Sequence, residues 1–227
     1  MNKFIAFEGL DGSGKTTQIK MLLDYLDNKK ISYKFLHFPR ISETIIGDMI
    51  ARFLRGEYGS IEDTNPHFLA LMYAQDRHDA KQLLVDGIQN HQLLVVDRYV
   101  YSNIAFQCAK MRDEYHKKNI KNWILQLEYE HFALPKPDLT LFLKPPHDFI
   151  KNNLVNQRVG DDREYLKGAT DIHENNLLFQ LEVEQEYLKL TDFDENFKIV
   201  NYQEEQHLLD LIEINHIIIN HVEMLLK

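Results

Sequence analysis

The chain has 227 residues, of which 44% are hydrophobic and 27% charged, enough for one domain over 1–227 with a substantial core. No run of 18 apolar residues occurs, and no charged leader precedes the first apolar run, so we expect neither a membrane partner nor a secretory signal. The net charge of −9 argues against a nucleic-acid-coating protein. The single cysteine, Cys108, excludes an internal disulfide and fits a reducing, cytoplasmic location.

Short apolar runs alternate with longer amphipathic stretches along the whole chain. The predicted strands are 4–7, 33–37, 93–97, 139–143 and 197–200. The predicted helices lie near 15–28, 43–55, 65–89, 101–111, 119–130, 147–157, 172–190 and 204–226. This order predicts an α/β protein with three layers, in which helices flank a central five-stranded parallel sheet. Ligands should collect at the carboxyl ends of its strands.

The first predicted strand leads into a glycine-rich loop and then a helix. The loop reads Gly9-Leu10-Asp11-Gly12-Ser13-Gly14-Lys15-Thr16-Thr17. The G-x4-G-K-T spacing between a strand and a helix predicts a loop whose backbone N–H groups surround nucleotide phosphates. Lys15 is placed to reach the β- and γ-phosphates, and the Thr16 hydroxyl to ligate Mg²⁺. The alternative is an ordinary glycine-rich turn.

Charged residues follow the second and third predicted strands. Pro39 ends the second strand and presents Arg40, whose planar guanidinium matches phosphate oxygens. The third strand ends in Asp97-Arg98, and an acidic residue at that place can approach the Mg²⁺ shell of a phosphate-loop enzyme. A solvated surface arginine at position 40 and a structural Asp97–Arg98 ion pair are the alternatives.

Two predicted helices carry groups that suit a flat heterocycle. Tyr73 and Arg77 are four residues apart and therefore lie on one helix face, so the ring could stack on a base while the guanidinium donates to a carbonyl oxygen. Core packing and a surface charge would explain the same pair. A second helix begins around Asn103, Phe106 and Gln107 and could form a pocket wall.

Residues 156–171, NQRVGDDREYLKGATD, are the most polar stretch of the chain. We predict a lid here, because segments that close over a nucleotide are built from such low-stability material. Arg158, Arg163 and Lys167 could then deliver a cation to a transferring phosphoryl group. An ordinary solvated surface is the alternative.

Taken together, these segments resemble the thymidylate kinases, nucleoside-monophosphate kinases that phosphorylate dTMP. The matching stretches are FEGLDGSGKTTQ (7–18), FPR (38–40), YAQDR (73–77), DRYVYSNIAFQ (97–107) and LPKPDLTLFL (134–143). The similarity runs from residue 3 to about residue 200. It implies a P-loop kinase fold, ATP as co-substrate with Mg²⁺, dTDP as the product for dTTP supply, and a homodimer.

The resemblance also implies roles for single residues. The loop from Gly9 to Thr17 binds ATP, and the metal ligands are Thr16, Asp97 and Asp11. Asp11 also approaches the substrate, while Arg40 and Arg98 hold the dTMP phosphate. The other implied dTMP contacts are Phe38, Tyr73 stacked on thymine, Arg77 at O4, Ser102, Asn103 and Gln107 at the base edge, and Phe106 near the 2′ position. Lys15, Asp11 and Arg98 are the implied catalytic residues of the core.

One position departs from part of the family. Some members carry a basic residue directly after the loop aspartate, where this chain has Gly12. Members that lack this basic residue, as this chain does, supply the cation from the lid. The catalytic prediction therefore extends to Arg158 and Arg163, with Lys167 as a third candidate.

Two other functions stay open at this point. A deoxynucleoside kinase shares the loop and the sheet, and Glu8 would be its candidate base. A nucleotide-dependent switch or assembly ATPase would need a partner surface, and the apolar stripe of the predicted helix 204–226 could serve one or could serve a homodimer.

Overall fold

A computed structural model of the chain describes residues 2–41, 43–60, 64–155, 177–205 and 207–227. Its centre is a parallel sheet in the order β2-β3-β1-β4-β5. The five strands are β1 (Lys3–Gly9), β2 (Tyr33–His37), β3 (Leu93–Asp97), β4 (Leu139–Lys144) and β5 (Phe197–Asn201). All five predicted strands are confirmed. β1, β3 and β4 are almost wholly buried, as expected for parallel strands covered on both faces.

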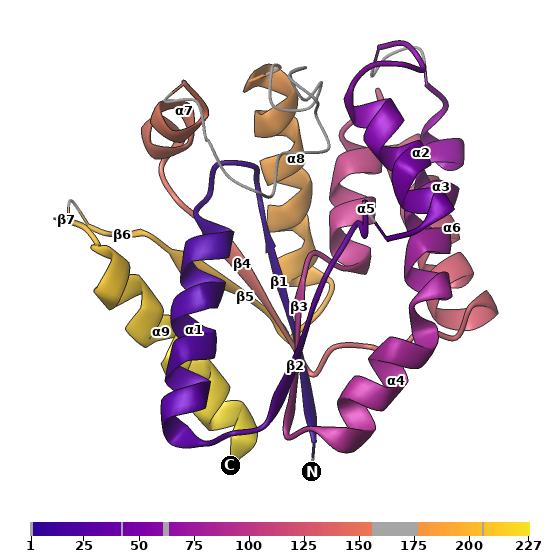
Figure 1. Cartoon of the computed structure of the whole chain (residues 1–227). Helices are drawn as coiled ribbons and strands as arrows, with labels where there is room; N and C mark the ends of the chain where they lie inside the picture. Colours follow the sequence, from indigo (N-terminus) through magenta and orange to yellow (C-terminus); the bar gives the residue numbers. More distant parts are fainter. Residues whose placement is uncertain (1, 42, 61–63, 156–176, 206) are drawn as a thin grey trace.

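Helices cover both faces of the sheet, so the predicted three-layer α/β architecture is confirmed (Figure 1). α1 (Lys15–Lys29) and α9 (Leu211–Leu226) lie side by side on one face. Their buried side chains, among them Leu22 and Ile218, share one core cluster with Ile5 and Phe7 of β1. The other helices are α2 (Ile45–Leu54), α3 (Pro66–Asp79), α4 (Lys81–Asn90), α5 (Val100–Cys108), α6 (Glu114–Leu125), α7 (His147–Val155) and α8 (Leu177–Lys189).

The predicted helix 65–89 is wrong as a single element. The chain forms α3 and α4, separated by Ala80, whose backbone angles (φ −92°, ψ 3°) leave the helical region. Ala80 is fully buried, so packing fixes a bend at a residue type that by itself favours a helix.

The beginnings of two other predicted helices are also wrong. The helix predicted from residue 204 starts at Leu211, where Asp210 and Glu213 form a capping box. The residues before it form a two-stranded antiparallel hairpin, β6 (Gln203–Glu204) with β7 (His207–Leu208). The helix predicted over 119–130 starts at Glu114 after an Asp113 cap, and it continues into η1, a π-helical turn (Gln126–His131).

The register of the sheet brings three functional loops to one edge. Phe7 of β1 and His37 of β2 both lie opposite Asp97 of β3. The glycine-rich loop, the Phe38–Arg40 turn and Arg98 therefore leave the sheet together at its carboxyl edge. None of the helices in the described part of the chain is long and apolar enough to cross a membrane.

Candidate functional site

The glycine-rich loop has the expected context, with β1 before it and α1 after it. Gly9 permits a close approach, because a Cβ there would lie 2.9 Å from Ser13 Oγ and 3.1 Å from the Leu143 carbonyl oxygen. Gly14 caps α1 in the left-handed region (φ 81°), which side chains disfavour. Thr16 and Thr17 are exposed in the first turn of α1.

Lys15 lies buried beneath this loop. Its Nζ donates to the carbonyl oxygens of Gly9 (3.1 Å) and Leu10 (3.0 Å). Burial, and then repulsion from Arg98, lower the pKa of the Lys15 ammonium to about 8. A buried ammonium held by carbonyl oxygens gains most from an arriving anion, because a fixed negative charge would offset its lost hydration.

Arg98 lies beside the loop in a left-handed conformation (φ 64°) directly after β3. Its Nη2 contacts Asp11 Oδ1 at 2.5 Å, its Nη1 donates to Ser102 Oγ at 3.3 Å, and its guanidinium lies 5.4 Å from the centre of the Phe106 ring. Burial opposes the charge of Arg98, but Asp11 and other neighbours outweigh it and raise the pKa. The structure thus brings together four residues predicted for the site.

Glu8, the last residue but one of β1, holds the turn that carries Arg98. Its carboxylate accepts hydrogen bonds from the Tyr99 N–H (2.9 Å), the Ser102 N–H (3.1 Å), Ser102 Oγ (2.5 Å) and the Tyr187 hydroxyl (2.9 Å). It is fully buried, and burial raises its pKa. With its oxygens occupied by four donors, Glu8 fixes the geometry of residues 98–102.

Asp97 is buried at the end of β3, and its Oδ2 lies 3.2 Å from His37 Nδ1. Its Oδ1 has no hydrogen-bond partner within the described residues. Burial opposes its charge, but His37, Lys15 and Arg98 hold the pKa of Asp97 below its usual value. The described residues contain no cluster of three His, Cys, Asp or Glu that could hold a metal by themselves. The metal roles of Asp97, Asp11 and Thr16 stay predictions.

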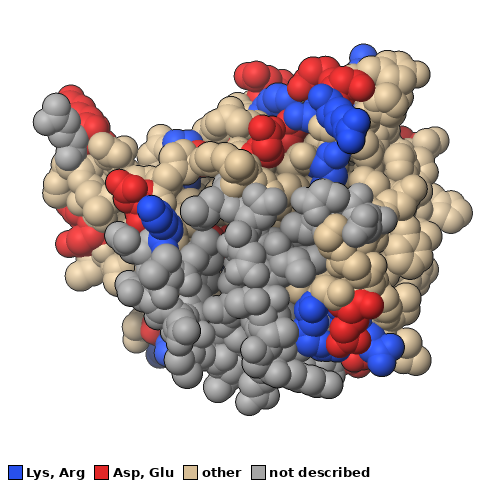
Figure 2. Space-filling model, turned by 90° about the horizontal axis from the view of Figure 1, so that it is seen from above, with Lys and Arg blue, Asp and Glu red and all other residues tan. Residues whose placement is uncertain are grey.

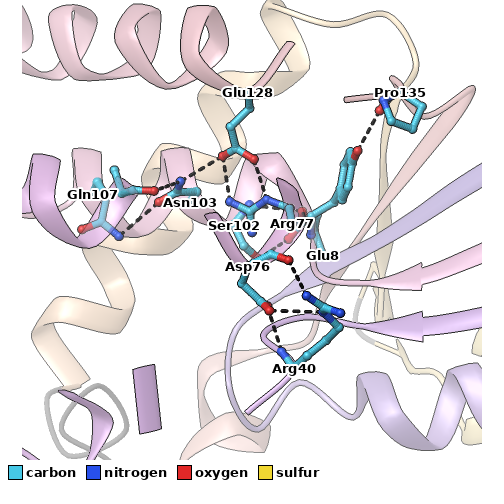
Figure 3. A network of polar contacts seen from close by, with 11 residues as sticks. Glu8, Arg40, Asp76, Arg77, Ser102, Asn103, Gln107, Glu128 and Pro135 are labelled. Atoms are coloured by element: carbon cyan, nitrogen blue, oxygen red, sulfur yellow. Dashed lines mark hydrogen bonds and ion pairs between the residues drawn. The ribbon is translucent and has the colours of Figure 1, made fainter. Parts of the chain in front are cut away.

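Arg40 is oriented by Asp76 of α3. Its backbone N–H donates to Asp76 Oδ2 (2.9 Å), its Nε to Oδ1 (3.2 Å) and its Nη2 to the Asp76 carbonyl oxygen (2.8 Å) (Figure 3). The preceding Phe38 is fully buried in the core. Sequence reasoning missed Asp76 as a site residue. Its position beside Arg77 in the YAQDR stretch was the signal that could have identified it.

A second polar group lies at α3, α5 and η1. Arg77 contacts Glu128 through Nε (2.5 Å) and Nη2 (2.7 Å), and Asn103 Nδ2 donates to the same carboxylate (2.9 Å). Gln107 Nε2 lies 3.5 Å from Asn103 Oδ1. Figure 3 shows these four side chains in a continuous row. Sequence reasoning missed Glu128, which comes from a stretch far from the other motifs.

Other predicted site residues have different positions. Tyr73 is half-buried and packs against the cluster formed by α2 and α3. Arg158, Arg163 and Lys167, with the whole predicted lid at 156–171, lie outside the described residues. On the end of the molecule seen in Figure 2, basic side chains lie next to acidic ones.

The fold and the loop define a P-loop nucleotide-binding protein. Residues 7–210 match the family described as thymidylate kinase. Relatives include the thymidylate kinase of Plasmodium falciparum (34% identical over 66% of this chain and 65% of that protein) and the probable thymidylate kinase of Pyrococcus horikoshii (31%, 87% of each). A solved thymidylate kinase from Candida albicans has a TM-score of 0.71 and 27% identity, covering 98% of this chain and 92% of that one. The chain belongs to the thymidylate kinase family.

Proposed function

We propose that this chain transfers the γ-phosphoryl group of ATP to the phosphate of dTMP, giving dTDP. The observation that carries the proposal is Lys15, a buried ammonium with carbonyl partners at the phosphate loop, beside a second, partly buried cation, Arg98. Family membership supports the identity of the acceptor.

The chain's own groups account for the charge that the reaction develops. Lys15 and the loop N–H groups bind the β- and γ-phosphates of ATP, and Arg98 with Arg40 binds the acceptor phosphate. Asp11 orients Arg98 through their 2.5 Å contact. The acceptor phosphate is already an anion, so no strong base is required.

The residues also fit Mg²⁺, which would supply positive charge to neutralise the phosphates when bound. Asp97 Oδ1, which has no hydrogen-bond partner among the described residues, and the exposed Thr16 hydroxyl are oxygen ligands of the kind that Mg²⁺ prefers. Mg²⁺ commonly keeps several waters and uses one or two carboxylates with substrate phosphates.

The two alternative functions gain no support from these contacts. A nucleoside kinase would use Glu8 as its base, but the Glu8 carboxylate accepts from Tyr99, Ser102 and Tyr187. Of the apolar side chains of α9, Ile214, Ile218 and Val222 pack on the protein's own core, whereas Leu211, Ile212 and Met224 are exposed. We infer a cytoplasmic homodimer from the family resemblance, and light scattering of the purified protein would test the dimer.

A coupled assay with ATP and Mg²⁺ tests the proposal, with dTMP, dUMP, dCMP, dGMP and thymidine offered separately. We expect turnover mainly with dTMP. Phosphorylation of thymidine but not of dTMP would assign the protein to the nucleoside kinases. ATP binding without turnover of any acceptor would favour the switch.

A further inference from the structure

Glu128 is a fully buried carboxylate (0% exposed) in the π-helical turn η1. Burying a carboxylate is unfavourable unless it is paired and hydrogen-bonded. Glu128 meets that condition with three donors, two from Arg77 of α3 and one from Asn103 of α5. One carboxylate therefore joins two residues, from separate helices, that the resemblance places at the base of the substrate.

The Asn103 amide can take only one orientation beside Glu128. Its Nδ2 lies 2.9 Å from Glu128 Oε1 and 3.0 Å from the Ala70 carbonyl oxygen, and both of these atoms are acceptors. Turning the amide over would bring Oδ1 against these two acceptors and remove the hydrogen bond that Asn103 donates to each. Asn103 Oδ1 is thus fixed on the opposite side, where the 3.5 Å contact with Gln107 Nε2 is long for a hydrogen bond.

Arg77 is fixed by the same carboxylate. Its Nε and Nη2 face Glu128 in a bidentate pair, which leaves the Nη1 edge without a partner among the described residues. Because a guanidinium has donors only, this edge can meet an acceptor but not an N–H group. The result is one fixed donor, Arg77, and one fixed acceptor, Asn103 Oδ1.

We propose that Glu128 is the positioning residue that sets the hydrogen-bond polarity of the base site, selecting a 4-oxo pyrimidine over a 4-amino one. Thymine and uracil present an acceptor at O4 and an N–H at N3, which complements Arg77 and Asn103. Cytosine presents an amino group at C4 and a lone pair at N3, so both contacts are reversed. This inference rests on the proposed function, and it adds a residue that contacts Arg77 and Asn103 and acts through them.

Glu128→Gln in the full chain tests the proposal. The amide keeps the shape of the side chain but replaces one carboxylate oxygen with an NH2 group, so at least one of the three donors from Arg77 and Asn103 would face a donor in the present orientations. We expect kcat/KM for dTMP and dUMP to fall about 30-fold, mainly through KM, since the site loses fixed hydrogen bonds to the base. We expect dCMP to change less than about threefold or to improve, so the dTMP/dCMP ratio falls at least about tenfold.

Glu186→Gln is the matched control. Glu186 is also buried and accepts from Lys117 (2.8 Å) and Lys189 (3.0 Å), but it lies on α8 and not in the base site. The control removes one buried negative charge and should leave the dTMP/dCMP ratio unchanged. An unchanged ratio in Glu128→Gln, or equal losses with dTMP, dUMP and dCMP, would overturn the proposal.

Glu128→Asp keeps the inference testable if Glu128→Gln does not fold, which circular dichroism would show. Asp retains the charge and both oxygens but is one methylene shorter, so it cannot reach Arg77 and Asn103 equally well. We expect an intermediate dTMP/dCMP ratio, and a wild-type ratio would contradict the proposal. Absence of dTMP turnover by the wild-type protein is a separate outcome, which would reject the proposed function itself.

Discussion

Two buried cations, Lys15 at the phosphate loop and Arg77 on α3, differ in what surrounds them. Lys15 contacts two carbonyl oxygens, and burial lowers its pKa to about 8. Burial also opposes the charge of Arg77, but its bidentate pair with Glu128 outweighs this effect and raises the pKa. The protein therefore holds one cation in need of an anion and one that is already neutralised.

This difference matches the two halves of the proposed substrate. A phosphate group is charged, so it gains most from a cation that has only neutral acceptors before it arrives, as Lys15 has in its two carbonyl contacts. A pyrimidine base is neutral, and a site that reads it needs donors and acceptors in fixed directions without net charge. Removing charge at the phosphate end should therefore affect activity, whereas removing it at the base end should affect stability and selectivity.

The largest effect is expected from Arg98→Ala. Arg98 contacts Asp11 and Ser102 at the carboxyl edge of the sheet, where the acceptor phosphate is proposed to bind. Removing a charge-stabilising group of this kind lowers kcat/KM by about 10³-fold. Arg52→Ala is the control, because Arg52 is half-exposed on α2 and pairs with Asp48 and Glu57; its steady-state rates should match the wild type. A loss below about tenfold in Arg98→Ala would remove Arg98 from the proposed phosphate site.

The second prediction concerns stability at the base end. Arg77→Met leaves the Glu128 carboxylate buried without its cation, and breaking such a pair costs about 3–5 kcal/mol of the free energy of unfolding. Replacing both partners, as Arg77→Met with Glu128→Leu, should restore most of that loss because no buried charge is left. Urea unfolding at pH 7 measures both variants. A double variant no more stable than the single one would show that the pair does not dominate the stability of this region.

The sheet was predictable because a parallel strand buried on both faces appears as a short apolar run, as in Leu93–Asp97. Helix boundaries were less predictable, and the reasons differ. The break at Ala80 depends on packing and has no local signal, since Ala favours helices. The start of α9 had a signal, Asp210 followed three residues later by Glu213, which is a capping box.

The same distinction applies to the site. The phosphate loop is continuous in sequence, so its spacing alone predicted the strand–loop–helix context. Glu128 comes from a separate stretch, and Glu130, two residues later, is exposed. Nothing local distinguishes the two glutamates, because the burial of Glu128 depends on Arg77 and Asn103, which approach it only in the folded protein.

The smallest expected effect is a pH dependence of ATP binding at Lys15. The pKa of its ammonium is about 8 in the protein without ATP, and bound phosphates should raise it, because a nearby anion favours the charged form. Below pH 8 the ammonium is charged both before and after binding, so the affinity contributed by Lys15 is constant. Above pH 8 the free protein loses this proton and must take it up again on binding, so affinity falls by up to about tenfold per pH unit.

Calorimetric titration of ATP–Mg²⁺ between pH 7 and 9.5, in pairs of buffers with different ionisation enthalpies, measures that proton uptake directly. We expect nearly none at pH 7 and close to one proton per nucleotide near pH 9, since the free ammonium is about nine-tenths deprotonated one unit above its pKa. Lys15→Arg is the control, because a guanidinium stays charged over this whole range. If Lys15→Arg took up the same proton, another group would be responsible for the uptake. The proposed contrast between Lys15 and the already paired Arg77 would then be wrong.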